Sequence, residues 1–224
     1  MLIDKDFLLL QLTDSAFPIG SFQHSFGLES YVHFGEVCDR ESLLSFMHSY
    51  LFGPFLFSDL LSFRLCFREF ENLDYLLELE ARLYALTSPR ELREANGKLG
   101  LRFIKTINSL GLDLPPWRAY IKRTSHPTHA TAYAILCASS SIDYEKSLNA
   151  YVYMQSSSLV LNAVKLVPLS QDAGQFVLLS LHEAFSSLRS RLEILDSNSL
   201  GASCPLYEIM AMDHENLSPR FYMS

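Results

Sequence analysis

The chain has 224 residues, about half of them hydrophobic, and a formal net charge of −7. This length is sufficient for one large core, and the acidic balance without a long basic run argues against nucleic acid as the main partner. The apolar run at residues 7–12 is too short for a spanning helix and lacks the flanks of a signal peptide. We therefore expect a cytoplasmic protein with no membrane attachment.

The four cysteines are far apart and have no zinc-ligand spacing, which favours reduced thiols in the cytosol. They are Cys38, Cys66, Cys137 and Cys204.

The first unusual segment is DSAFPIGSFQHSFGLES at residues 14–30, which lies between two helical patterns. Pro18 and Gly20 predict a turn after the first helix, with Phe22 and His24 at the start of the next one. Phe22 and His24 are then available to a binding partner. The alternative is that Phe22 is buried under the first helix with His24 as its polar cover.

From residue 39 onward, apolar residues recur at steps of three and four, which is typical of helices. Asp39 predicts an N-cap, and Gly53-Pro54 predicts a break into two helices. A further helix ends near Thr87. Ser88 then predicts the N-cap of the next helix, with Glu91 completing a capping box.

The second half predicts a small-residue helix from Pro127 and long helices capped by Asp143 and Ser170. Gly174, early in the last of these helices, suits the close approach of another helix, because glycine inside a helix is otherwise unfavourable. No segment alternates as a strand does. The sequence predicts an all-α protein, one domain over residues 1–224 with about nine or ten helices.

Candidate catalytic and metal-binding groups are sparse. His24 and Glu29 are five residues apart, and His126 and His129 are three apart across Pro127, but neither pair belongs to a complete ligand set. There is no nucleophile elbow and no phosphate-binding glycine loop. We expect no enzyme, no cofactor and no stable metal site.

Two segments remain to be explained. Lys165 ends an apolar helix, where a cation also stabilises the helix dipole, so a helix-end charge is the simpler explanation. The tail, residues 212–224, combines the helix-blocking Pro219 with Arg220, Phe221 and Tyr222, which are residue types common at binding hot spots. We expect the tail to be mobile in the isolated protein and ordered by a partner.

Three separated motifs, AFPIGSFQHSFGLES, NAVKLVPLSQDAGQ and MAMDHENLSPRFYMS, with the central segment TSPRELREANGKLG, resemble the UreF family of urease accessory proteins over essentially the whole chain. The detail is similar to the Helicobacter-type branch. Ser170 stands where many members have Gly, and Pro219 replaces the usual Ser before Arg220.

The resemblance implies an all-α homodimer that binds UreD (UreH in some bacteria), recruits the GTPase UreG and helps to deliver nickel to the urease apoprotein, without holding nickel stably itself. It implies partner-binding roles for Phe22, His24, Glu29, Lys165, Gln171, Gln175, His214, Glu215, Arg220 and Tyr222. For the dimer contact we expect the helix from residue 143 to 167, with Tyr151 and Tyr153.

Two other functions stay open at this point. The chain could activate the GTPase by inserting an arginine, for which Arg220 is the first candidate, because a tail can reach. It could also be a helical metallochaperone using His24, His126, His129 and Cys204.

Overall fold

The computed structural model describes residues 4–224, and within them every regular element is a helix, so the all-α prediction is confirmed. The α-helices run, in chain order, α1 (Lys5–Thr13), α2 (Leu28–His33), α3 (Arg40–Tyr50), α4 (Leu61–Arg68), α5 (Leu73–Leu86), α6 (Arg90–Ser109), α7 (Pro115–Ile121), α8 (His129–Ser139), α9 (Tyr144–Leu166), α10 (Gln171–Ser180), α11 (His182–Ile194) and α12 (Pro205–Asp213). Shorter helical segments are η1 (Ser21–Gln23), η2 (Leu51–Leu60), η3 (Ser197–Ser199) and η4 (His214–Asn216).

Three of the predicted N-caps are confirmed, because their side chains accept the expected main-chain hydrogen bonds. Asp39 accepts from the amide of Ser42, Asp143 from Lys146 and Ser170 from Ala173. The predicted cap at Ser88 is wrong. The N-cap of α6 is Pro89, whose side chain has no hydrogen-bonding group, and the Glu91 carboxylate expected in the capping box instead binds His214 and Arg220.

The predicted break at Gly53-Pro54 is confirmed, because two helices meet there across a kink. The helical span Arg40–Arg68 is kinked at this break, which lies in η2, the segment between α3 and α4. Gly53 takes the non-helical φ/ψ of −112°/−110°, and Pro54 after it has no amide proton to donate to the helix. This helix is long and apolar enough by composition to cross a membrane, yet half of its apolar window is buried inside the protein, as a core helix requires.

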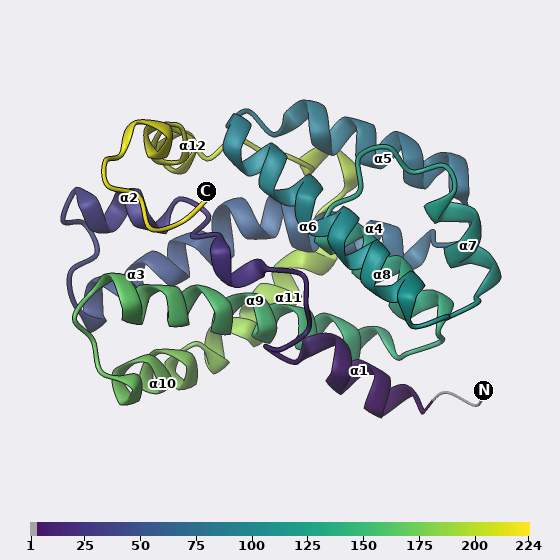
Figure 1. Ribbon diagram of the computed structural model, residues 1–224, viewed down its shortest axis with the longest axis horizontal. Helices are drawn as coiled ribbons and strands as arrows, with labels where there is room; N and C mark the ends of the chain where they lie inside the picture. The colour runs from purple at the N-terminus through teal and green to yellow at the C-terminus, as the bar shows by residue number, and fades with distance from the viewer. Residues whose placement is uncertain (1–3) are drawn as a thin grey trace.

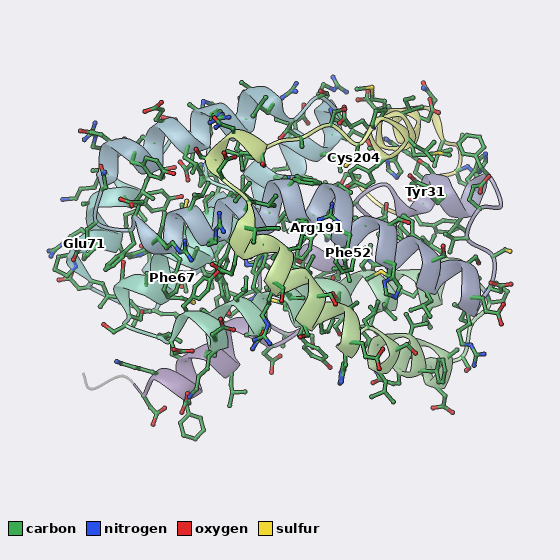
Figure 2. All side chains as sticks on the ribbon, turned by 180° about the vertical axis from the view of Figure 1, so that it is seen from behind. Tyr31, Phe52, Phe67, Glu71, Arg191 and Cys204 are labelled. Carbon is green, nitrogen blue, oxygen red and sulfur yellow. The ribbon has the colours of Figure 1, made fainter. Side chains whose placement is uncertain are left out.

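The centre of the core is the packing of α4 against α8. Phe63 and Cys66 of α4 are fully buried, and α8 is buried along nearly its whole length, with alanines at 130, 132, 134 and 138. Small side chains allow two helices to approach closely, and the aromatic rings fill the remaining space. Seen from behind, α11 crosses the kinked helix near Phe52 (Figure 2).

The corner between α9 and α10 forms as the sequence predicts. A Cβ atom on Gly174 would lie 2.9 Å from the Val164 side chain, so only glycine lets the two helices pack this closely. The chain ends its path beside α2 and α12, at the opposite end of the molecule from the start of α1 (Figure 1). This path brings the tail next to residues 14–30.

Candidate functional site

The three sequence motifs, although far apart along the chain, meet at one place. The amides of Ser25 and Phe26 donate to the main-chain oxygen of Ser224, at 2.6 and 3.0 Å. The Asn162 side-chain amide donates to the main-chain oxygen of His24 at 2.8 Å. The first motif is therefore held between the last residues of the chain and the end of α9.

Local backbone geometry in the first motif makes this junction possible. Gly20 and Gly27 have φ values of +82° and +83°, and Phe26, at +50°, shares this left-handed region. The resulting turn points the successive amides of Ser25 and Phe26 toward the same oxygen. Such paired amides form a concave donor site that a main-chain oxygen can occupy.

Glu29, in the first turn of α2, holds the tail through its main chain. Its carboxylate is 4% exposed and accepts hydrogen bonds from the amides of Phe221 and Tyr222, at 2.7 and 3.0 Å. Bonds from main-chain donors to a charged acceptor are stronger than bonds between neutral groups. Glu29 thus fixes the direction of the tail through its main chain, whatever the side chains at these two positions are.

His214 connects this anchor to α6. Its Nε2 lies 3.0 Å from Glu29 and its Nδ1 lies 2.6 Å from Glu91, and the ring is 1% exposed. An ionised carboxylate only accepts hydrogen bonds, so the imidazole has an acceptor beside each of its two nitrogens. The other Glu91 oxygen pairs with Arg220 at 2.7 Å. Two carboxylates and two basic side chains therefore form one network across α2, α6 and the tail.

His24 closes the junction from the other side. Its Nδ1 lies 2.8 Å from the Ser224 hydroxyl. Burial, and to a smaller degree the charge of Lys98, lowers the pKa of His24 to about 4. His24 is therefore neutral at neutral pH and is a hydrogen-bonding partner of the tail.

These contacts change the roles expected of several predicted residues. His24, Glu29, His214 and Tyr222 are buried against the chain itself, so they hold the tail and are not exposed to a partner. Phe22, in contrast, is 58% exposed, which excludes the alternative of a buried Phe22. Exposed Glu215 pairs with Arg90 at 3.3 Å.

The tail differs from the expected arrangement in one respect. Met212 and Asp213 belong to α12, and residues 221–224 are bound to the chain's own Gln23–Glu29 segment. The sequence did not reveal this, because the donors and acceptors involved are mostly main-chain groups. The mobility of the tail in the isolated protein stays a prediction.

A second feature joins three of the predicted residues. Phe22, Tyr153 and Lys165 line one groove between residues 12–22 and α9, which encloses about 310 Å³. Tyr153 is half exposed, and Lys165, Gln171 and Gln175 are exposed as well. Tyr151, expected at a dimer contact, is fully buried and its hydroxyl donates to Asp59 at 3.2 Å. Tyr151 therefore belongs to the core, because it lies on the inner face of α9.

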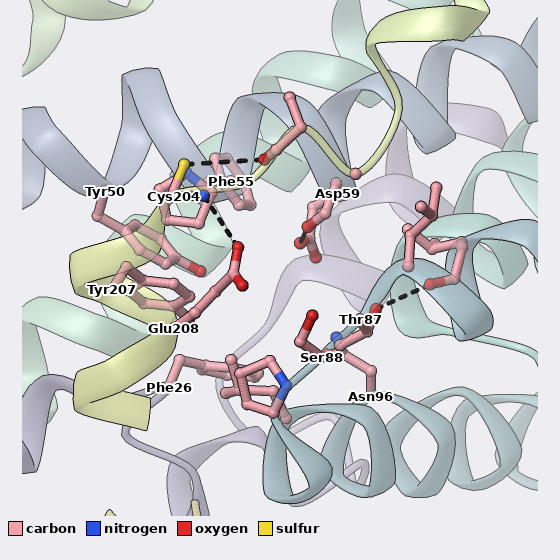
Figure 3. Close-up of a pocket in the computed structure, with 18 residues that line it drawn as sticks. Phe26, Tyr50, Phe55, Asp59, Thr87, Ser88, Asn96, Cys204, Tyr207 and Glu208 are labelled. Atoms are coloured by element: carbon pink, nitrogen blue, oxygen red, sulfur yellow. Dashed lines mark hydrogen bonds between the residues drawn. The ribbon is translucent and has the colours of Figure 1, made fainter. Parts of the chain in front are cut away.

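Sequence reasoning missed a polar pocket around Asp59 in η2. Figure 3 shows Tyr50, Tyr207 and Glu208 on one side of this pocket, with Asp59 and Ser88 across from them. The volume of this cavity is about 70 Å³. Burial raises the pKa of Asp59, which accepts a hydrogen bond from the Ser58 hydroxyl at 2.6 Å. A single Asp in an apolar helix was the available signal, but it identifies no pocket by itself.

The residues suggested for a metallochaperone do not come together. His126 stacks on Tyr84, whereas His129 lies among Phe103, Tyr133 and Tyr151, where burial lowers its pKa to about 3. Cys204 lies beside Gly53. Across residues 4–224, no group of three or more His, Cys, Asp or Glu side chains is placed to hold a metal ion.

Comparisons with known proteins agree with the motifs. A family model described as UreF matches residues 37–182. A urease accessory protein UreF of Paenarthrobacter aurescens is 35% identical over 96% of both chains, and one of Corynebacterium glutamicum is 34% identical over 99% of both. A third, from Lachnoclostridium phytofermentans, is 33% identical over 96% of this chain and 97% of its own. These relatives do not support the narrower resemblance to the Helicobacter-type branch. The chain belongs to the UreF family of urease accessory proteins.

Proposed function

We propose that this chain is a non-enzymatic, cytoplasmic scaffold of urease maturation. With a UreD (UreH) partner, it recruits the GTPase UreG for nickel insertion into the urease apoprotein. Nickel is the cargo of the assembly and is not held stably by this chain, and neither nucleic acid nor a membrane is a partner. The observation that most supports this proposal is the meeting of three motif segments at one surface.

The surface in question is made by both ends of the chain. The Met223 amide donates to the main-chain oxygen of Gln23 at 2.9 Å, which sets the tail beside η1. Along the tail, Tyr222 and Ser224 are buried, while Phe221 and Met223 are 79% and 51% exposed. We infer that these two side chains and Phe22 together form an exposed apolar surface. We call this surface, made of Phe22, Phe221 and Met223, the docking face. Exposed aromatic and Met side chains of this kind are enriched at protein interfaces.

When the tail is bound to the chain, contacts within the chain form the docking face. Glu29 and the amides of Ser25 and Phe26 fix the tail backbone, so binding does not need to order all of it. Preorganisation of this kind reduces the entropic cost of association. We infer that the UreD-like partner binds the docking face, with Arg220 and Glu215 at its polar edge.

We further propose a homodimer formed through the exposed face of α9. Tyr153 and Lys165 line the groove beside Phe22, and a two-fold contact is the commonest closed arrangement. Light scattering on the purified chain tests this, and a monomer at all working concentrations would reject it.

Co-expression of the chain with the UreD, UreG and urease proteins of its own organism tests the scaffold. Replacement of Phe22 and Phe221 by Ser should abolish co-elution with the UreD-like protein in size exclusion and leave the helical content unchanged. Ile194→Ser is the matched control, because Ile194 is 82% exposed elsewhere on the molecule. Normal complexes with the double variant would contradict the proposed docking face.

The alternative, a GTPase-activating role for Arg220, has one observation in its favour. The Arg220 side chain is 40% exposed, although it must leave Glu91 to reach a bound nucleotide. An inserted arginine typically raises hydrolysis by about 10³–10⁵. Arg220→Ala that keeps UreG bound but slows GTP hydrolysis by this order would favour activation. Loss of UreG with unchanged hydrolysis by the remaining GTPase would favour the scaffold.

A further inference from the structure

A groove between α5 and α6 lies outside the docking face. It is bounded by Tyr84 of α5, by Gly97, Lys98 and Leu101 of α6, and by His126 in the loop before α8, and it encloses about 290 Å³. Its aromatic wall is already ordered. The rings of Tyr84 and His126 stack with centroids 4.1 Å apart, and the Arg93 guanidinium lies 5.4 Å from the Tyr84 centroid.

Gly97 forms part of the lining and is not explained by the fold of the chain. It lies in the interior of α6, where glycine weakens a helix relative to alanine. A Cβ at Gly97 would meet nothing within 4 Å, whereas a Cβ at Gly100 would lie 2.4 Å from the main-chain oxygen of Pro127. Gly100 is therefore required by packing within the chain. The space above Gly97 is open to an approaching molecule.

The charge around this groove differs from that of the whole chain. Residues 90–123 carry eight Lys and Arg against three Asp and Glu, although the chain has a net charge of −7. Lys98, Arg102 and Lys105 follow one another at steps of four and three, so they share one face of α6. Within residues 4–224, no carboxylate lies at ion-pair distance from Arg102 or Lys105, and Lys98 reaches Glu94 only at 3.8 Å.

Leu101 connects the two features. It lines the groove, lies beside the basic residues on α6, and is 58% exposed. An apolar groove bordered by cations, two of which have no carboxylate at ion-pair distance among residues 4–224, is complementary to a partner segment with carboxylates around an apolar side chain. Nucleic acid is a less suitable ligand, because three cations in a row are too few to follow its phosphate backbone.

From these observations we infer that the α5–α6 groove and the adjoining basic face of α6 dock an acidic segment of a partner protein, which inserts an apolar side chain over Gly97. This inference rests on the proposed function, because the partner is one of the proteins of the proposed assembly. The groove shares no lining residue with the docking face, so the two can be tested separately if Arg102 is left intact, because its Nε donates to the main-chain oxygen of Pro18 in the first motif at 3.0 Å.

The first test maps the contact in the complex. A photo-crosslinking amino acid replaces Leu101 in the full chain, which is co-expressed with the UreD, UreG and urease proteins of its organism. We expect a crosslink to an acidic peptide of one of these proteins, identified by mass spectrometry, and none from the same amino acid at Ile194. A crosslink only to nucleic acid or lipid, or none in a complex that forms normally, overturns the inference. If the unaltered chain forms no complex at all, the proposed function fails and the inference with it.

The second test uses binding to the protein that is identified. Lys98→Glu and Lys105→Glu together should raise Kd by about tenfold or more at low salt and flatten its salt dependence. Arg191→Glu, an exposed charge reversal on α11, should leave Kd unchanged.

Gly97 supplies a readout that a structural role would not give. Gly97→Ala should raise the Tm of the isolated chain and yet weaken binding, and Gly97→Leu should weaken it further by filling the groove. Unchanged Kd in both Gly97 variants and in the charge-reversal variant would overturn the inference.

Discussion

The α4–α8 core and the tail junction are held by different forces. The core is built from buried aromatic and aliphatic side chains such as Phe63 and Tyr133, which exclude water over a large area. In the junction, residues 217–224 bury only Tyr222 and Ser224 and are held mainly by hydrogen bonds to Glu29 and to the Ser25–Phe26 amides. Apolar burial is cooperative and non-directional, whereas a few hydrogen bonds contribute little net stability each. We therefore expect the tail to be released at a lower free-energy cost than unfolding of the core.

The largest expected effect lies in the core. Phe63→Ala should lower the free energy of unfolding by about 3–5 kcal/mol, because it leaves a cavity in the α4–α8 contact. Urea denaturation followed by circular dichroism measures the loss. If the cost were no greater than that of deleting residues 217–224, the two regions would not differ as we describe.

A second change should separate the two regions. Glu29→Gln removes the charge that accepts two tail amides and faces His214, and should cost about 1–3 kcal/mol locally, because one of the two acceptor oxygens becomes an NH2 donor that faces buried donors. Hydrogen exchange should become fast at Phe221 and Tyr222 and remain slow in α8. Glu215→Gln is the control, since Glu215 is exposed and pairs only with Arg90 among the described residues. Faster exchange throughout α8 would show that the tail and the core unfold together.

A third prediction concerns pH. The pKa of His24 is about 4 in the folded chain and about 6.5 when the chain is unfolded, so the unfolded state binds the proton more tightly. His24 should therefore reduce stability as the pH falls from about 6.5 toward 4, and leave it unaffected above that range. His129 acts in the same direction, because its folded pKa is about 3. His24→Gln should reduce the proton uptake on unfolding, measured from the pH dependence of urea midpoints. An unchanged pH dependence would place His24 in a more solvated state.

The smallest effect on stability is expected at Lys165. Lys165→Ala should change the free energy of unfolding by only about 0.3–1 kcal/mol, because an exposed charge near a helix end contributes little. Urease activation in cells should nevertheless fall, since Lys165 lines the groove shared with Phe22. Unchanged activation with normal protein abundance would reduce Lys165 to a helix-end charge.

The sequence was informative where local chemistry decides the structure. The caps at Asp39, Asp143 and Ser170 depend on residues three positions away, and the close packing at Gly174 follows from the lack of a side chain. Reasoning failed where distant residues compete for the same group. Glu91 could not be assigned correctly, because its partners His214 and Arg220 are more than 120 residues away.

The candidate site shows the same limit. The motifs identified the residues that gather at the junction, but not which of them would face inward. His24, Glu29 and Tyr222 were expected at a partner surface and are buried, whereas Phe22 is exposed as expected. The orientation depends on main-chain hydrogen bonds between the two ends of the chain, and these carry no residue-type signature.

Asn162 contacts the first motif and the tail from the same end of α9 that carries Lys165. Its side-chain amide binds the main chain of His24, its main-chain oxygen lies 3.5 Å from the Tyr222 hydroxyl, and Lys165 follows one turn later on α9. A ligand that shifts this end of α9 on binding Lys165 would alter the affinity of the tail for its seat. By thermodynamic reciprocity, seating the tail must then change the affinity at Lys165 by the same factor. The last turn of α9 thus couples ligand binding at Lys165 to binding of the tail.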